Sequence, residues 1–270
     1  MKLHVAVWAG SLLLALVVGM ALASLVWTPY GPLSIDLTSR LLAPNAAHWL
    51  GTDEFGRDVL SRIMTAAASS LIVASLTVGI ALIIGGCVGL AAGYFGGLAD
   101  RLLMVFNDTL LAFPNVLFAF AVIVIAGQSK YGIVIGLGPA YAPTVARVVR
   151  SSVLSLRERA YVESSRVMGN SSAYTLFRHV LPNCTAPLLM LATSLFGWII
   201  LAEGTLNFLG LGVPPPAPTW GNMLASGRPY IEAAPWLCIA PGMCFALTLL
   251  AVNMLGDALR DRLDPRTRKF

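Results

Sequence analysis

Long apolar stretches limit this chain more than any other feature of its sequence. Six of them reach or approach the length of about 20 mostly apolar residues that a helix needs to cross a lipid bilayer. They are residues 5–27, 69–93, 102–126, 132–149, 186–206 and 235–256. Because a segment inside lipid must satisfy its own backbone hydrogen bonds, each stretch is expected to be helical. We predict an all-α polytopic membrane protein with six transmembrane helices.

The composition also favours a membrane protein. The chain is 57% hydrophobic and 11% charged, whereas soluble domains carry about 25% charged residues. Its net charge of +5 is not arranged as an interleaved basic and aromatic stripe, so we expect no nucleic-acid partner. The 4 cysteines lie apart in or beside apolar runs and the 3 histidines are scattered. They indicate packing residues and no metal site.

The first apolar stretch could be a retained anchor or a cleaved signal. Lys2 precedes it, and the Ala21-Leu22-Ala23 sequence near its end could mimic a signal-peptidase site. The apolar core of a secretory signal is about 7 to 15 residues long, which is shorter than this stretch. We therefore expect a retained membrane anchor.

The distribution of lysine and arginine predicts the orientation in the membrane. With the N-terminus in the cytoplasm, 13 basic residues fall on the inner side and 5 on the outer side. Inner loops of membrane proteins carry an excess of such residues. We therefore predict cytoplasmic N- and C-termini. The inner residues are Lys2, Arg101, Arg147, Arg150, Arg157, Arg159, Arg166, Arg178, Arg260, Arg262, Arg266, Arg268 and Lys269.

Two longer segments between the stretches, residues 28–68 and 207–234, are predicted on the outer side. We divide the chain into residues 1–68, an N-terminal transmembrane helix with an outer segment, and residues 69–270, a five-helix core. The core contains a cytoplasmic element at about 156–180.

Charged residues gather in the sequence YVESSRVMGNSSAYTLFRHVLPN, residues 161–183. Ser171 or Ser172 can cap a helix here, and Gly169 suits the left-handed backbone that ends a preceding helix. We predict a short helix, a turn and a second helix, with Pro182 marking the entry to the fifth span. This hairpin either links two spans or docks another protein. Its expected apolar stripe is Ala173, Tyr174, Phe177, Val180 and Leu181.

The spacing within this hairpin resembles a family signature. Glu163 followed by two serines, then Gly169, then the pair Leu181-Pro182, is similar to the "EAA" signature of permease subunits of bacterial ABC importers, in which the two serine positions are usually alanine. The segments "HWLGTDEFGRDVLSR", "GYFGG", "FLGLGVPPPAPTWGNML", "PWLCIAPG" and "NMLGDALRDRLDPR" resemble the dipeptide, oligopeptide and nickel branch of that family. The resemblance implies the MetI-like fold of type I ABC importer permeases.

The resemblance also implies a function and partners. This chain would be the second permease subunit of an importer that moves dipeptides or short oligopeptides by alternating access, with nickel or another small solute as the alternative cargo. The implied partners are a homologous permease, two ABC ATPase subunits, an extracytoplasmic solute-binding protein and the lipid of a bacterial inner membrane. The hairpin would be a coupling helix on one ATPase. Its implied coupling residues are Glu163, Ser164, Ser165, Arg166, Gly169, Leu181 and Pro182.

The chain itself lacks the sequence pattern of an ATPase. A phosphate-binding loop needs the pattern G-x-x-x-x-G-K-[ST], and none of Lys2, Lys130 and Lys269 follows a glycine. We therefore expect no catalytic residue and no cofactor bound by this chain. By the resemblance, ATP and magnesium would be held by the partner ATPase subunits.

Ionisable groups at membrane depth are costly and often functional. Asp108 and Asn115 in the third stretch, and Glu203 near the outer end of the fifth, could line the translocation pathway. The alternatives are a helix-end salt bridge for Asp108 and an exposed helix end for Glu203. Asp257 is expected to join a salt-bridge network of the tail with Arg260 and its neighbours.

The outer segments are the predicted contact surface for the binding protein. Asp53 and Arg57 belong to a segment that could form a structured cap, or a helix lying on the lipid with Val59 and the following apolar residues beneath it. Trp220 lies in the second outer segment, within the loop of residues 207–230.

Two other classes of protein fit this sequence less well. An ion-coupled secondary transporter would have midplane charges or broken helices in paired repeats, but the sequence shows no repeat pair and its charges lie towards the ends of the stretches. An intramembrane enzyme would need a nucleophile and base or metal ligands, and neither H-E-x-x-H nor G-x-S-x-G occurs.

Overall fold

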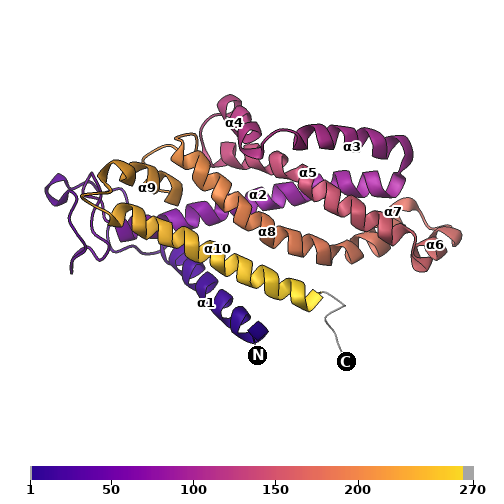
Figure 1. Cartoon of the computed structure of the whole chain (residues 1–270), viewed down its shortest axis with the longest axis horizontal. Coiled ribbons are helices and arrows are strands. Elements are labelled where there is room, and N and C mark those ends of the chain that lie inside the picture. The colour runs from indigo at the N-terminus through magenta and orange to yellow at the C-terminus, as the bar shows by residue number, and fades with distance from the viewer. Residues whose placement is uncertain (1, 264–270) are drawn as a thin grey trace.

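The protein is an elongated bundle of helices (Figure 1), seen in a computed structural model that describes residues 2–263. Among these residues the only β-type pairing is an isolated bridge between Thr52 and Asp58. The long helices run roughly along one axis, with α6 and α7 at one end and α9 at the other. The helices are α1 (Lys2–Ala23), η1 (Leu37–Ser39), α2 (Val59–Phe95), α3 (Gly97–Leu111), α4 (Asn115–Ala126), α5 (Lys130–Arg157), α6 (Ala160–Val167), α7 (Ser172–Thr175), η2 (Leu176–Val180), α8 (Leu181–Phe208), α9 (Trp220–Gly227), η3 (Arg228–Tyr230) and α10 (Trp236–Leu263).

The predicted membrane spans are present in the described part of the chain. Five helices are long and apolar enough to cross a bilayer, and the pair of α3 and α4 makes a sixth span if the two are counted together. The all-helical, polytopic fold is therefore confirmed. Of the basic residues used to predict orientation, Arg266, Arg268 and Lys269 lie outside the described residues.

The third predicted span is not one straight helix. Residues 102–126 contain the end of α3 and all of α4, and the two helices are bent by 89°. Pro114 stands at the break, where it has no backbone N–H to donate and where it disfavours a helical conformation of the residue before it. The apolar length predicts a span here, but proline divides it into two helices.

The core of the bundle is the close packing of α2 against α5. Gly85, Gly89 and Gly93 recur at every fourth position along one face of α2. A Cβ atom added at Gly85 would lie 2.3 Å from the carbonyl oxygen of Ala142, and one at Gly89 would lie 2.5 Å from that of Ala146. Small residues spaced in this way let the backbones of two membrane helices approach closely. The absence of side chains on this face therefore fixes how α2 and α5 pack.

The start of α2 differs from the sequence prediction. The helix begins at Val59 because the Asp58 carboxylate caps it, accepting a hydrogen bond of 2.8 Å from the backbone N–H of Ser61. Val59 and Ile63 are buried, so this turn does not form a separate helix lying on lipid. The boundary predicted at residues 68 and 69 consequently falls inside α2, and the structured-cap alternative describes residues 28–58.

The fifth span is continuous with the end of the hairpin. Residues Ser172–Phe208 form one helical stretch of 37 residues that contains α7, η2 and α8. Within it η2 is a π-helical turn, closed by a hydrogen bond from the N–H of Leu181 to the carbonyl of Leu176. The wider turn accommodates Pro182, whose ring would otherwise clash with the carbonyl four residues earlier. Pro182 therefore does not separate the hairpin from the span.

Candidate functional site

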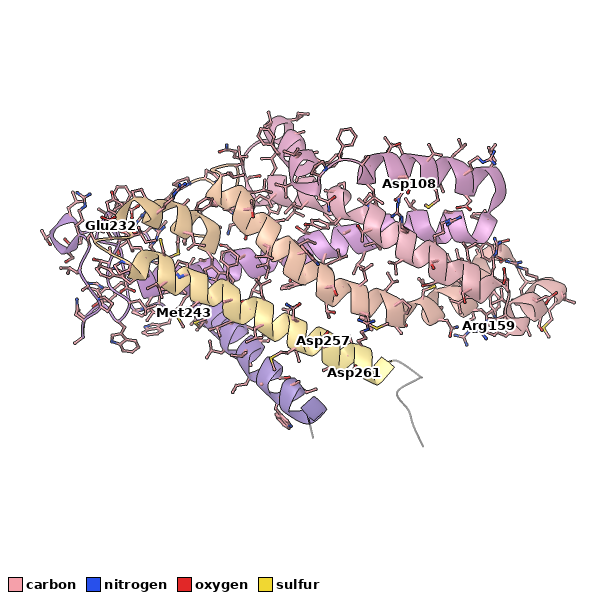
Figure 2. The ribbon with its side chains drawn as sticks, in the orientation of Figure 1. Asp108, Arg159, Glu232, Met243, Asp257 and Asp261 are labelled. Atoms are coloured by element: carbon pink, nitrogen blue, oxygen red, sulfur yellow. The ribbon has the colours of Figure 1, made fainter. Side chains whose placement is uncertain are left out.

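The hairpin of α6 and α7 lies at one end of the bundle, beside the labelled Arg159, far from Glu232 at the other end (Figure 2). Gly169 turns the chain between its helices with a positive φ of 80°. The N–H of Gly169 bonds to the carbonyl of Arg166 and the N–H of Asn170 to that of Ser165, at 3.0 and 3.2 Å. These two bonds make a Schellman motif. The predicted turn at Gly169 and the predicted cap by Ser171, which accepts from Tyr174, are confirmed.

A cluster of three side chains holds the two helices of the hairpin together. The hydroxyl groups of Ser165 and Thr175 are 3.0 Å apart, and both residues are buried. Asn170 donates from its side-chain amide to the Ser165 hydroxyl at 3.2 Å. Ser164, the neighbouring serine, is exposed. The two serines of the signature therefore differ, because Ser165 bonds inside the hairpin and Ser164 faces outward.

Arginine side chains attach the hairpin to the end of α2. The guanidinium group of Arg166 lies over the ring of Tyr94, 4.9 Å from its centroid. Arg157, at the end of α5, donates to the carbonyl of Gly93 at 3.2 Å. Both contacts reach the last turn of α2. Arg166 attaches the hairpin there, and Arg157 joins the end of α5 to the same turn.

The outer surface of the hairpin carries apolar side chains. Val167 and Met168, next to the turn, are 82% and 80% exposed, and Phe177 is 64% exposed. The predicted apolar stripe is wrong in part, since Phe177 and Tyr174 face outward, whereas Thr175 and Val180 pack inward. The remaining signature residues Glu163 and Pro182 are exposed, and Leu181 is half-buried. Exposed apolar groups at a helical turn are typical of a protein contact.

Asp108 forms a salt bridge and does not line a cavity with Asn115. Its carboxylate accepts from Arg147 at 2.7 Å, which links α3 to α5 on the surface of the bundle (Figure 2). Both side chains are exposed. The helix-end salt bridge is therefore the arrangement seen, because Asp108 lies in the last turn of α3.

Asn115 lines a cavity of about 480 Å³ between α4, α5 and α8. Tyr141 and Thr144 of α5 and Trp198 of α8 are on the same wall. Neither Asp108 nor Glu203 is among its lining residues. Of the three predicted pathway residues, Asn115 is the one that faces this open space.

Glu203 is fully buried, so the expectation of an exposed helix end was wrong. Its Oε1 atom accepts from the side-chain amide of Asn207 at 2.6 Å and from the Ser70 hydroxyl at 3.4 Å, while Oε2 has no partner among the described residues. Asn207 in turn accepts from the N–H of Val213 at 2.7 Å. Glu203 therefore joins α8 to α2 and to the loop that follows α8. Sequence spacing gave no signal of this contact with Ser70.

The predicted binding-protein residues belong to a dense cap at the end opposite the hairpin. Arg57 donates to the Asp53 carboxylate at 2.6 Å, and both side chains are buried. Burial raises the pKa of the nearby Glu54 carboxyl. Trp220 is fully enclosed, donating to the carbonyl of Ile63 at 3.4 Å and packing against Phe245. The predicted direct contact by Asp53, Arg57 and Trp220 is therefore not available in this structure, because all three support the cap from within.

An all-helical bundle of membrane-spanning length, with a rigid exposed hairpin at one end and a folded cap at the other, defines a polytopic membrane permease. Residues 85–269 match the family described as "Binding-protein-dependent transport system inner membrane component". This chain belongs to that family. It is thus a membrane-embedded component of a transport system, as the resemblance of its motifs implied.

Curated relatives support the same family over nearly the whole chain. The dipeptide transport system permease protein DppC of Alkalihalophilus pseudofirmus is 43% identical over 231 residues, covering 86% of this chain and 76% of the relative. The glutathione transport system permease protein GsiD of Pectobacterium atrosepticum is 39% identical over 269 residues, covering 99% and 89%. The di/tripeptide transport system permease protein DppC of Pseudomonas aeruginosa is 42% identical over 266 residues, covering 96% and 88%.

A solved structure supports the fold. An inward-facing conformation of the MetNI methionine ABC transporter matches with a TM-score of 0.59 at 17% identity, covering 75% of this chain and 96% of that chain. The likeness confirms the MetI-like fold of an importer permease.

Proposed function

We propose that this chain forms half of the pathway by which an ATP-driven importer moves dipeptides or short oligopeptides across a bacterial inner membrane by alternating access. Relatives that are about two-fifths identical are named as permeases for dipeptides, for di/tripeptides and for glutathione, itself a short peptide. A peptide cargo is the substrate class that these names share.

The partners in this proposal are a homologous permease, two ABC ATPase subunits and an extracytoplasmic solute-binding protein. ATP and magnesium would be bound by the ATPase subunits and not by this chain. The hairpin end would face the cytoplasm and the cap end the outside, in agreement with the distribution of basic residues in the sequence. Since α1 and α10 pack together and α1 begins on the side where α10 ends, both termini would be cytoplasmic.

The observation that carries the proposal is the construction of the hairpin. Its outer surface exposes Val167, Met168 and Phe177, and its second helix continues without a break into α8. An ATPase that bound this surface and moved would therefore tilt a helix of 37 residues. At about 1.5 Å per residue such a helix is about 55 Å long, enough to span a bilayer.

The cap would receive the solute-binding protein. Asp53, Arg57 and Trp220 would act by holding the shape of that surface. The exposed side chains of Trp49 and Phe55 would provide the contact, at 69% and 43% exposure.

The test is uptake of a radiolabelled dipeptide by cells that produce this chain with its partner subunits, alongside ATP hydrolysis by the purified complex. Gly169→Pro is expected to abolish uptake while leaving membrane insertion and ATP hydrolysis intact, because proline fixes φ near −65° and Gly169 has φ of 80°. Unchanged uptake by this variant would refute the coupling role of the hairpin. Failure of the unaltered chain to support uptake of any short peptide would refute the cargo.

A further inference from the structure

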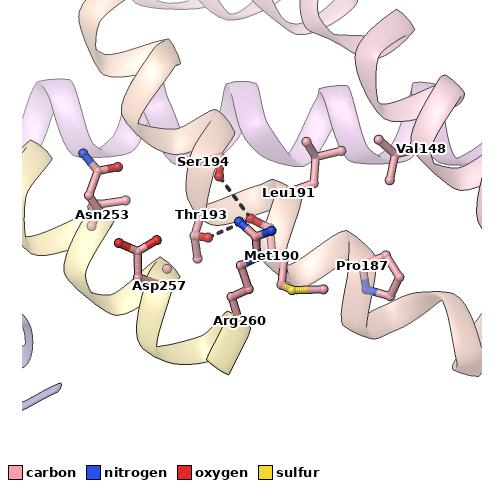
Figure 3. A pocket seen from close by; sticks show the side chains of 11 residues that line it. Val148, Pro187, Met190, Leu191, Thr193, Ser194, Asn253, Asp257 and Arg260 are labelled. Atoms are coloured by element: carbon pink, nitrogen blue, oxygen red, sulfur yellow. Dashed lines mark hydrogen bonds between the residues drawn. The ribbon is translucent and has the colours of Figure 1, made fainter. Parts of the chain in front are cut away.

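Two cavities follow one another along the same faces of α5 and α8. The first, of about 480 Å³, contains Asn115 and lies towards the cap end. The second, of about 470 Å³, lies towards the hairpin end and is bounded by α8 and α10 (Figure 3). On α5, Thr144 lines the first cavity and Val148 the second. On α8, Trp198 lines the first and Ser194 the second.

Residues four positions apart lie on the same face of a helix, one turn from each other. Thr144 and Val148 are therefore neighbours on α5, as are Ser194 and Trp198 on α8. The two cavities are therefore adjacent along the bundle, and we call them together the α5/α8 furrow. Thr205 extends its lining towards the cap end and Asp257 towards the hairpin end.

Several polar side chains of this furrow lie exposed among its apolar ones. Ser194, Thr205 and Asn253 are all exposed on helices of membrane-spanning length. The exposed Leu76 and Ile83 of α2, in contrast, are apolar. Polar groups at membrane depth face a protein interior or a water-filled cavity. The hydroxyls of Ser194 and Thr205 bond to carbonyls of their own helix. The exposed Asn253, Asp257 and Arg260 of the second cavity are the groups that need water or a second protein wall beside the furrow.

Two opposite charges stand at the hairpin end of the furrow. Asp257 and Arg260 are one turn apart on α10, both exposed, and both line the second cavity (Figure 3). Among the described side chains no ion pair joins Asp257 to Arg260, so this part of the predicted network is not formed. In Figure 3 the Arg260 side chain extends towards α8, where the Thr193 and Ser194 hydroxyls donate to the carbonyl of Met190.

The spacing of these charges suits the two ends of a short peptide. Side chains three positions apart on a helix have their Cβ atoms about 5 to 6 Å apart. An extended chain of two residues spans about 7 Å, with an ammonium group at one end and a carboxylate at the other. A carboxylate and a guanidinium group at this separation complement both ends at once.

We propose that the α5/α8 furrow is the wall that this chain contributes to the peptide pathway, and that Asp257 and Arg260 bind the ammonium and carboxylate groups of a dipeptide at its inner mouth. This inference rests on the proposed function, since it names the part of the chain that meets the cargo. Uncharged donors and acceptors along the furrow, such as Asn115 and Ser194, are suited to peptide groups without selecting a side chain.

The first experiment asks whether the furrow holds water. Single cysteines replace Ser194 or Thr205, or the matched controls Leu76 or Ile83, in a chain whose 4 native cysteines are changed to alanine. Inside-out membrane vesicles containing the whole transporter are treated with a charged, membrane-impermeant maleimide. We expect labelling of Ser194→Cys and Thr205→Cys at a rate about tenfold or more above that of the controls, because the thiolate forms only in contact with water. Equal, slow labelling at all four positions would overturn the proposal.

The second experiment asks what occupies the inner mouth. Alanyl-alanine is added to the same vesicles and is expected to slow labelling of Ser194→Cys more effectively than N-acetyl-alanyl-alanine or alanyl-alanine amide. Adding Asp257→Asn should raise the half-protecting concentration of the free dipeptide by about tenfold, as expected for one lost charge-assisted hydrogen bond, with little change for the N-acetyl peptide. Arg260→Gln should likewise raise the half-protecting concentration of the free dipeptide by about tenfold, with little change for alanyl-alanine amide.

The outcomes separate this inference from the proposed function. If cells take up the dipeptide but no peptide protects the cysteine, the proposed cargo is supported and the binding role of Asp257 and Arg260 is refuted. If the cysteines are labelled but cells take up no peptide, the proposed peptide cargo is refuted, and with it the assignment of Asp257 and Arg260 as peptide-binding residues. Equal weakening of all three peptides by Asp257→Asn would indicate a merely structural role and would also overturn the assignment.

Discussion

Replacement of Gly169 by alanine isolates the energetic cost of the hairpin turn. An added Cβ would meet nothing within 4 Å, so the substitution creates no clash. The remaining cost is the left-handed backbone, with φ of 80°, which is about 1 to 2 kcal/mol for a residue with a side chain. At 1.4 kcal/mol for each factor of ten, the equilibrium between the closed and the opened hairpin should shift by about five- to thirtyfold.

The shift can be measured without transport. Hydrogen–deuterium exchange of the Asn170 amide should accelerate by the same factor in Gly169→Ala, since this amide bonds to the Ser165 carbonyl across the turn only while the turn is closed. In the assembled transporter, the number of peptides taken up for each ATP hydrolysed should fall. The exchange rate in Gly169→Asn should lie between that of the unaltered chain and that of Gly169→Ala, because asparagine tolerates the left-handed region better than alanine does.

Gly210 provides a matched control at the other end of α8. It has φ of 76°, and an added Cβ there would also meet nothing within 4 Å. Gly210→Ala carries the same backbone cost but lies far from the hairpin, so it should leave exchange of residues 165–175 unchanged. Exchange in Gly169→Ala that equals that of the unaltered chain would refute the reasoning, as would equal uncoupling by Gly210→Ala.

Other substitutions test the packing that supports this end of the molecule. Ser165→Ala should weaken the hairpin by about 1 kcal/mol through the lost hydroxyl contacts, visible as faster exchange of α7, whereas Ser164→Ala should have no effect. Gly89→Val should sharply reduce the amount of folded protein recovered from membranes, because its Cβ would lie 2.5 Å from a backbone oxygen of α5. Gly86→Val, with open space around it, is the control. Asp58→Ala should lower the stability of the purified protein to heat by about 1 kcal/mol through the lost cap on α2.

Much of the fold could be predicted because lipid allows few structures. Apolar length identified the spans, and basic residues supplied a predicted direction. The turn at Gly169 could also be predicted, since left-handed backbone after a helix favours glycine strongly and the adjacent serine offered a cap. In these places a local preference decided the structure, so the sequence contained the answer.

Contacts between distant segments could not be predicted in the same way. Glu203 meets Ser70 across 133 positions of the chain, and no local pattern indicates that a carboxylate should be buried there. Pro114 was a local signal for a break, but the angle between α3 and α4 depends on how they pack against α5. Tyr174 and Phe177 follow the helical period and face outward together, but Val180, predicted on the same stripe, is buried at the end of the π-helical turn. A pattern with a period of 3.6 residues does not indicate where such a turn shifts the faces of a helix.

The π-helical turn η2 sets an angle as well as a length. One residue more than a regular helical turn rotates everything before it by about 100° around the axis of α8. The number of residues in the turn Leu176–Val180 therefore sets the direction in which α6 projects from the axis of α8. Deleting one residue there would leave each helix intact, but Val167 and Met168 would be exposed on a different side of the α8 axis. Fit to a neighbouring protein would then be lost with no bond broken inside this one.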